Sequence, residues 1–191
     1  FNLQELPQIL NLARQQGVMT WSVFFLVPTG RGLVTDEIAP HEYEDVMHWL
    51  YDASKYVRIK TTEGHHYKRV VLQRNILEQH NANHREVLNL GATYQRLSDD
   101  LAVLVGASDE ETLEPERVTR SPMHINAGKG FVFISRRGEI YPSGFMPVVA
   151  GNVREESLVD VYRTAPLFQS LRDTEQLEGR CGACEFKSIC G

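Results

Sequence analysis

The stretch VMTWSVFFLV, residues 18–27, gives the strongest indication of the fold of this chain. It is almost continuously apolar and rich in valine and aromatic residues, a pattern that predicts a buried β-strand. A helical spacing of apolar residues over 2–16 precedes it, and the turn-forming sequence PTGRG at 28–32 follows it. The N-terminal part therefore begins with a helix followed by a buried strand.

The same order repeats along the next fifty residues. Residues 40–56 predict a second helix with Pro40 in its first turn, residues 57–62 a second strand, and residues 65–80 a third helix. The apolar face of the second helix is formed by Tyr43, Val46, Met47, Leu50 and Ala53. Alternating helices and strands are typical of parallel α/β architecture. We also expect a helix over 87–105.

A polar, proline-bearing stretch over 106–122 predicts a linker. It divides the chain into a first domain at 1–105 and a second at 123–191. The second domain is expected to begin with a β-hairpin, because residues 131–135 and 139–142 flank the turn sequence Arg136-Arg137-Gly138.

The rest of the second domain is expected to be a loop followed by a helix. The loop covers 144–153, with Gly151-Asn152 as its turn. The helix covers 157–171, with Ser157 as N-cap, and Pro166 is expected to shorten or kink it.

Composition excludes several classes of partner. Hydrophobic residues make up 42% of the chain and charged residues 24%, as in ordinary globular proteins. The net charge of −5 argues against a nucleic-acid-binding surface, which needs a clustered basic excess. No apolar run approaches the roughly 20 residues that cross a bilayer, so we expect no membrane partner.

The only cysteines are Cys181, Cys184 and Cys190, in the spacing C-x2-C-x5-C. Three thiolates on a short segment fit zinc or an iron–sulfur cluster, and both usually need a fourth ligand. Zinc sites usually add a second cysteine pair or histidines, so the asymmetric spacing favours a cluster, with zinc as the alternative. Closely spaced thiols favour a reducing compartment, here the cytoplasm. A start at Phe1 and an end one residue after Cys190 suggest a fragment.

Three segments of the second domain carry a resemblance to a known family. They are GEIYPSGF at 138–145, GNV at 151–153, and the cysteine run at 181–191. Together they resemble the SPASM/twitch extension of radical S-adenosylmethionine enzymes, in the branch related to haem and haem d1 biosynthesis. Residues 131–191 carry most of this match, and residues 1–80 resemble the last strands and helices of the partial (β/α)6 barrel. The implied fold is late α/β barrel elements followed by a small α+β twitch domain.

The resemblance implies that Cys181, Cys184 and Cys190 bind an auxiliary [4Fe–4S] cluster whose fourth ligand lies outside the chain. Ser143 stands where SPASM proteins often have a cysteine, which implies a single auxiliary cluster. The radical-generating C-x3-C-x2-C motif is absent, since no cysteine precedes Cys181. In the family that motif lies near the N-terminal end of the barrel, upstream of where this chain begins, so the chain alone identifies no catalytic residue.

Other residues are candidates for the ligand-binding mouth of the barrel. Thr29 and Arg31 follow the first strand, where α/β proteins place ligand-binding loops, and the resemblance puts them near S-adenosylmethionine or substrate. A simple strand-to-loop turn is the alternative. His124 and Asn126, just before the hairpin, could face the active-site cleft.

The implied function is radical modification of a tetrapyrrole or peptide substrate by a parent enzyme, an oxidoreductase or transferase. The alternative is a non-enzymatic, zinc-stabilised binding module. Two parallel strands cannot close a barrel, so we expect their unpaired edges to drive self-association of the fragment.

Overall fold

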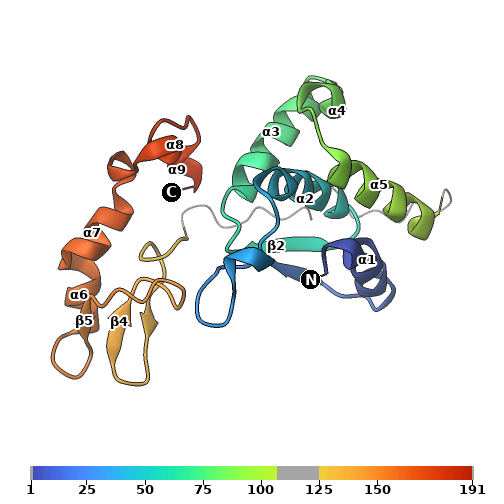
Figure 1. The fold of residues 1–191 in the computed structure, drawn as a ribbon. Helices are drawn as coiled ribbons and strands as arrows, with labels where there is room; N and C mark the ends of the chain where they lie inside the picture. The colour runs from blue at the N-terminus through green and yellow to red at the C-terminus, as the bar shows by residue number, and fades with distance from the viewer. Residues whose placement is uncertain (1, 107–124, 191) are drawn as a thin grey trace. The chain divides into compact units, whose positions relative to one another are not determined.

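The computed structural model describes residues 2–106 and 125–190, which fall into two compact units, Phe1–Ser121 and Pro122–Gly191. Both contain helices and strands, which confirms the mixed α/β class (Figure 1). The linker expected over 106–122 lies outside the described residues, apart from Gly106. Among the described helices, none is both long and apolar enough to cross a membrane.

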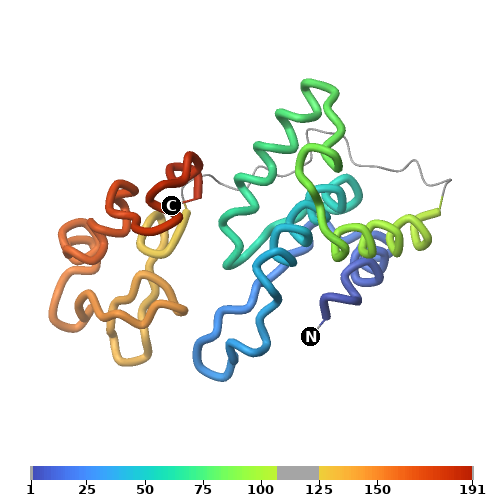
Figure 2. The backbone as a smooth tube through the Cα atoms, turned by 45° about the horizontal axis from the view of Figure 1, so that its top comes forward, coloured from blue at the N-terminus to red at the C-terminus, as the bar shows by residue number. Residues whose placement is uncertain are grey.

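The first unit follows the predicted order of helices and strands. Its elements are the 3-10 turn η1 (Leu3–Glu5), α1 (Leu6–Gln15), β1 (Thr20–Phe24), the 3-10 turn η2 (Val34–Asp36), α2 (Pro40–Ala53), β2 (Arg58–Thr62), α3 (Tyr67–Gln79), α4 (His84–Val87) and α5 (Ala92–Val105). Strands β1 and β2 pair in parallel, with Thr20 opposite Arg58 and Phe24 opposite Thr62. Helices α2, α3 and α5 gather on one side of this sheet (Figure 1), and Figure 2 follows the long connection from β1 into α2.

Helix α2 is the centre of the first unit. Met47, Trp49, Leu50 and Ala53 are completely buried, and the helix packs against β2, α3 and α5. The predicted apolar face is confirmed at Val46, Met47, Leu50 and Ala53, whereas Tyr43 is half-buried. Burial extends further around the helix than that face, because Asp45 and His48 are also inside.

A polar network joins α2 to its two neighbouring helices. The guanidinium of Arg74 on α3, only 1% exposed, pairs with Asp52 on α2 at 2.5 Å. The Tyr94 hydroxyl on α5 donates to the other oxygen of Asp52 at 2.7 Å. Arg74 also lies 4.6 Å from the centre of the Tyr51 ring. Because an unpaired buried charge is costly, these contacts fix α3 and α5 relative to α2.

The helix expected over 87–105 is wrong at its beginning. Helix α4 ends at Val87 and α5 begins only at Ala92. Between them Asn89 has φ +47°, and Gly91 is extended, with its backbone N–H donating to Asp45 at 2.7 Å. The buried Asp45 carboxylate also accepts from the backbone of Tyr94, so α2 supplies the N-terminal cap of α5.

The second unit is built from short elements. They are β3 (Phe133–Ile134), β4 (Glu139–Tyr141), β5 (Gly151–Asn152), α6 (Leu158–Thr164), α7 (Pro166–Arg172), the 3-10 turn η4 (Thr174–Gln176), α8 (Gly179–Gly182) and α9 (Lys187–Cys190). The predicted β3–β4 hairpin is confirmed, and Gly138 at its turn has φ +86°. The prediction that Gly151-Asn152 is only a turn is wrong, because these residues form a third strand antiparallel to β4.

The expected helix at 157–171 is present in two parts. The Ser157 side chain accepts from the backbone N–H of Asp160, which confirms it as N-cap of α6. Ala165 is extended (ψ 133°), as residues before proline prefer, and Pro166 starts α7. Ile140, Val161 and Phe168 then form the small core that joins the sheet to both helices.

In the described part of the first unit, β1 and β2 pair only with each other, so each strand has one open edge. Self-association through these edges stays a prediction. We expect light scattering of the purified chain to give a mass above 21.7 kDa. A monomer at all accessible concentrations would contradict it.

Buried His48 predicts a pH dependence of folding. Burial, followed by the nearby Arg74 charge, lowers the pKa of His48 to about 4, whereas an unfolded histidine titrates near 6.5. Between these values the unfolded state binds more protons. The free energy of unfolding should therefore be fully retained above pH 6.5 and fall as the pH drops toward 4, by up to about 3 kcal/mol from this residue.

We expect His48→Gln to flatten this slope in urea unfolding measured at a series of pH values. His80→Gln, at an exposed histidine, is the control and should keep the wild-type slope. Burial also lowers the pKa of His65, His66 and His84, so part of the slope should remain. Equal slopes for wild type and His48→Gln would contradict the assignment.

Candidate metal centre

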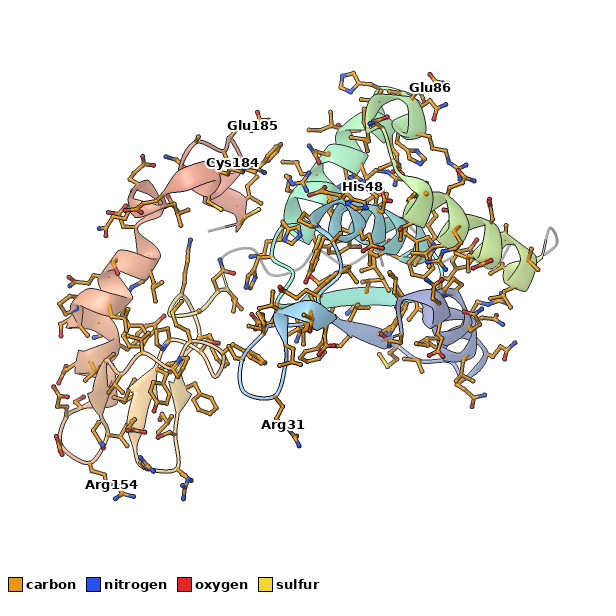
Figure 3. All side chains as sticks on the ribbon, in the orientation of Figure 1. Arg31, His48, Glu86, Arg154, Cys184 and Glu185 are labelled. Atoms are coloured by element: carbon orange, nitrogen blue, oxygen red, sulfur yellow. The ribbon has the colours of Figure 1, made fainter. Side chains whose placement is uncertain are left out.

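The three cysteines lie in and between two short helical turns near the end of the second unit. Cys181 is in α8, Cys184 lies two residues after the end of α8, and Cys190 ends α9. Cys181 is exposed, whereas Cys184 and Cys190 are half-buried, and within the described residues none of them is in a disulfide. Figure 3 labels Cys184 and Glu185 in this stretch. We refer to residues 177–190 as the cysteine segment.

Local hydrogen bonds shape the C-x2-C part of the segment. The backbone N–H of Cys184 donates to the Cys181 carbonyl at 3.2 Å, which closes a single turn. The N–H of Phe186 donates to the Cys184 sulfur at 3.4 Å. Such N–H donors to sulfur stabilise a thiolate and tune a bound cluster. Cys181 and Cys184 are therefore held in one turn by the backbone itself.

Gly182, between this cysteine pair, allows a close approach of two backbone segments. A Cβ at this position would overlap the carbonyl oxygen and carbon of Leu177. The N–H of Gly182 donates to the Glu178 carbonyl at 3.1 Å and draws the turn back onto the preceding residues. Only glycine fits this site without a backbone shift.

Two side-chain contacts tie the later part of the segment to its surroundings. The Lys187 ammonium pairs with Glu175 at 2.8 Å. The Asn126 side-chain amide donates to the Cys190 carbonyl at 2.6 Å. A position of Asn126 at an active-site cleft stays a prediction, and its contact with Cys190 leaves no pattern in the sequence. His124 lies outside the described residues.

The donor set fits a thiophilic metal, because three thiols lie within ten residues and one already accepts a backbone N–H. Their side chains have not converged, however. Within residues 2–106 and 125–190, no three His, Cys, Asp or Glu side chains lie close enough together to hold a metal ion. Their role as ligands therefore stays a prediction.

The structure places Thr29 and Arg31 on the exposed connection after β1. The N–H of Gly32 donates to the Thr29 carbonyl, and Gly30 between them has φ +63°, which makes a tight turn. Arg31 projects outward from this turn (Figure 3). The position is at the carboxyl end of β1, as expected, and a cofactor-binding role for either residue stays a prediction.

Residues that follow β2 lie at the same carboxyl edge of the sheet. Burial raises the pKa of Glu63, whose φ of +57° is unusual for a residue other than glycine. Burial also lowers the pKa of His66, whose ring lies 6.2 Å from that of Tyr43. The order of elements along the sequence predicts Glu63 at the same mouth, because it ends the second strand, whereas its left-handed backbone leaves no signal in the sequence.

Comparison with known proteins supplies a family relationship. No protein-family model matches the chain, and no solved structure matches it. An "AdoMet-dependent heme synthase" of Methanosarcina barkeri is 34% identical over 191 residues, covering 99% of this chain and 46% of that protein. Proteins of the same name from Nitratidesulfovibrio vulgaris and Oleidesulfovibrio alaskensis are each 31% identical over 194 residues, covering all of this chain and 45% and 42% of their own lengths.

The chain is thus related to S-adenosylmethionine-dependent proteins, which confirms the resemblance to the radical S-adenosylmethionine family. Within that class, its relatives are the AdoMet-dependent haem synthases of the haem biosynthesis branch. The chain spans a little less than half the length of these relatives.

The Gly182 contact predicts the effect of a single methyl group. We expect Gly182→Ala to loosen the cysteine segment by about 1–3 kcal/mol, because the new Cβ overlaps the Leu177 carbonyl. Limited trypsin digestion at Arg180 and Lys187 should then proceed about fivefold faster or more, since cleavage follows local opening. Gly144→Ala is the control, because a Cβ there makes ordinary contact with Phe133 at 3.5 Å. Unchanged digestion of Gly182→Ala would show that the close approach does not constrain the segment.

Proposed function

We propose that this chain is the C-terminal part of a radical S-adenosylmethionine enzyme whose second unit is a twitch-type domain that binds an auxiliary [4Fe–4S] cluster. The observation that carries the proposal is the placement of all three cysteines. They lie in one segment that follows a three-stranded sheet and two helices in the sequence. The similarity to AdoMet-dependent haem synthases covers 99% of the chain. Cys181, Cys184 and Cys190 are the proposed cluster ligands.

The first unit supports the proposal as a late part of a partial (β/α) barrel. Its two strands are parallel and connected through α2, the repeating unit of such barrels. The connection that carries Thr29 and Arg31 and the turn at Glu63 both leave the carboxyl ends of these strands. Ligands bind at that end in α/β barrels, so these loops are proposed to contribute to the S-adenosylmethionine or substrate site.

The chain's own contribution to the auxiliary site is to supply thiolates and hold them. A [4Fe–4S] cluster, when bound, supplies electron transfer or a Lewis-acidic iron. The Phe186 N–H stabilises the Cys184 sulfur, and the Lys187–Glu175 pair restrains the start of α9. A fourth ligand from outside the chain completes the site. The radical-generating cluster is proposed to lie outside this chain, since Cys181 is its first cysteine.

The proposed reaction is radical modification of a tetrapyrrole by the parent enzyme. The names of the relatives favour a tetrapyrrole over a peptide, which stays the second possibility. A compartment with reduced thiols, the cytoplasm, fits an iron–sulfur site. A non-enzymatic zinc-stabilised module would use the same three thiols, and metal uptake distinguishes the two.

The test is anaerobic reconstitution of the chain with iron, sulfide and 2-mercaptoethanol, whose thiolate can replace the outside ligand. We expect a broad absorption at about 400 nm and about four iron and four sulfide per chain. Serine replacements at Cys181, Cys184 or Cys190 should each weaken or abolish it. Ser188→Ala, a change inside the same segment that removes no thiol, should not.

Zinc competition decides between the two metals. A chain that stays colourless with iron and sulfide and takes up one zinc would overturn the cluster proposal and support the zinc-stabilised module. A coloured chain that keeps its cluster in the presence of equimolar zinc supports the proposal.

A further inference from the structure

We infer that Asn126 is the positioning residue that fixes Cys190 within the cysteine segment and so determines whether the third thiolate reaches the metal. The inference rests on the proposed metal site. The residue lies 64 positions away from Cys190 and supplies no thiol of its own.

The three thiols differ in what holds them. Cys181 and Cys184 share one backbone turn, so their spacing is set locally. Cys190 is six positions further on, at the end of a four-residue helix. So short a helix cannot orient its last residue by itself, because its final carbonyls have no donors within the helix. The third thiol therefore needs an outside contact.

Asn126 supplies that contact. Its side-chain amide donates to the Cys190 carbonyl at 2.6 Å, which gives a carbonyl at the end of α9 a donor. Rotating the amide by 180° would place its oxygen against the carbonyl oxygen, so the N–H orientation is the favourable one.

Asn126 is itself fixed to the core of the second unit. Its backbone pairs with Lys129 in both directions, at 2.9 and 3.0 Å. The N–H of Gly128, inside this turn, donates to the Pro142 carbonyl just after β4. Gly128 has φ +74°, and a Cβ there would crowd Leu171 and Phe168 on α7. The turn at 126–129 is therefore fixed against the sheet and α7, and through the side chain of Asn126 it fixes the Cys190 carbonyl relative to them.

The other end of the amide points to a function beyond packing. Among the described residues, the side-chain oxygen Oδ1 of Asn126 is buried and has no hydrogen-bond partner. An unsatisfied buried acceptor is unfavourable, so local hydrogen bonding alone does not explain the residue. Hydrogen-bonding residues behind metal ligands orient those ligands and commonly contribute 10–100-fold to affinity. An open acceptor beside a ligand is suited to receive one more N–H when the segment closes on a metal.

The first experiment needs no metal. Asn126→Asp keeps the size of the side chain and removes the donor, and Asn126→Ala removes it without adding charge. The matched control is Asn152→Asp in the same unit, where Asn152 contacts Arg154 and Arg137 and not the cysteine segment. Iodoacetamide labelling followed by mass spectrometry reports each thiol separately. We expect both Asn126 variants to speed alkylation of Cys190, with Cys181 at its wild-type rate and thermal unfolding unchanged.

The second experiment uses the reconstituted chain. Loss of the absorption at about 400 nm to a chelator should be about 10-fold faster or more in both Asn126 variants than in wild type and in Asn152→Asp. The positioning role is overturned if the wild-type chain binds the cluster and the Asn126 variants match it in both the alkylation rate of Cys190 and the rate of iron loss. That outcome leaves the proposed function intact. A wild type that binds no cluster overturns the proposed function, and with it the metal-positioning role of Asn126.

Discussion

The burial of α2 is the constraint on which the first unit depends. Where α2 faces the sheet and the two other helices, its ionisable side chains are withdrawn from water, so each of them must be neutralised inside. Asp45 receives backbone N–H groups of α5, Asp52 receives Arg74 and Tyr94, and His48 stays uncharged. Arg74 left without Asp52 would cost about 3–5 kcal/mol. The same contacts that neutralise α2 therefore set the positions of α3 and α5.

The second unit depends on a different principle. Among its described residues the core contains three buried apolar side chains, Ile140, Val161 and Phe168, and the strands are two or three residues long. Other contacts hold the chain where apolar burial is small. The backbone at Gly128 lies against side chains of α7, the backbone at Gly182 lies against the Leu177 carbonyl, and Asn126 and Lys187 contribute side-chain bonds. Such an arrangement suits a segment that gains its final order from a bound group, because metal binding contributes folding free energy.

Local patterns in the sequence predicted most elements because each has a local cause. Apolar spacing located α1, α2 and β1, and Ser157 and Pro166 located the start and the interruption of the 157–171 helix. Strand β5 was missed because two residues carry no periodicity, and the break before α5 was missed because its cause is Asp45, 46 residues earlier. The cysteines identified a candidate metal centre for a similar reason, since ligand spacing is local. The contact that orients Cys190 spans 64 residues and leaves no such pattern.

The cap of α5 also has a consequence for the order of folding. Gly91 offers no side chain to cap the helix, and the carboxylate that does so belongs to α2. An isolated peptide covering α5 would therefore lack its N-terminal hydrogen bonds and should be largely unstructured in water. During synthesis α2 leaves the ribosome before α5. The Asp45 carboxylate on α2 therefore lacks these backbone donors until residues 91–94 have been made. Helix formation at α5 is therefore expected to be coupled to its docking against α2.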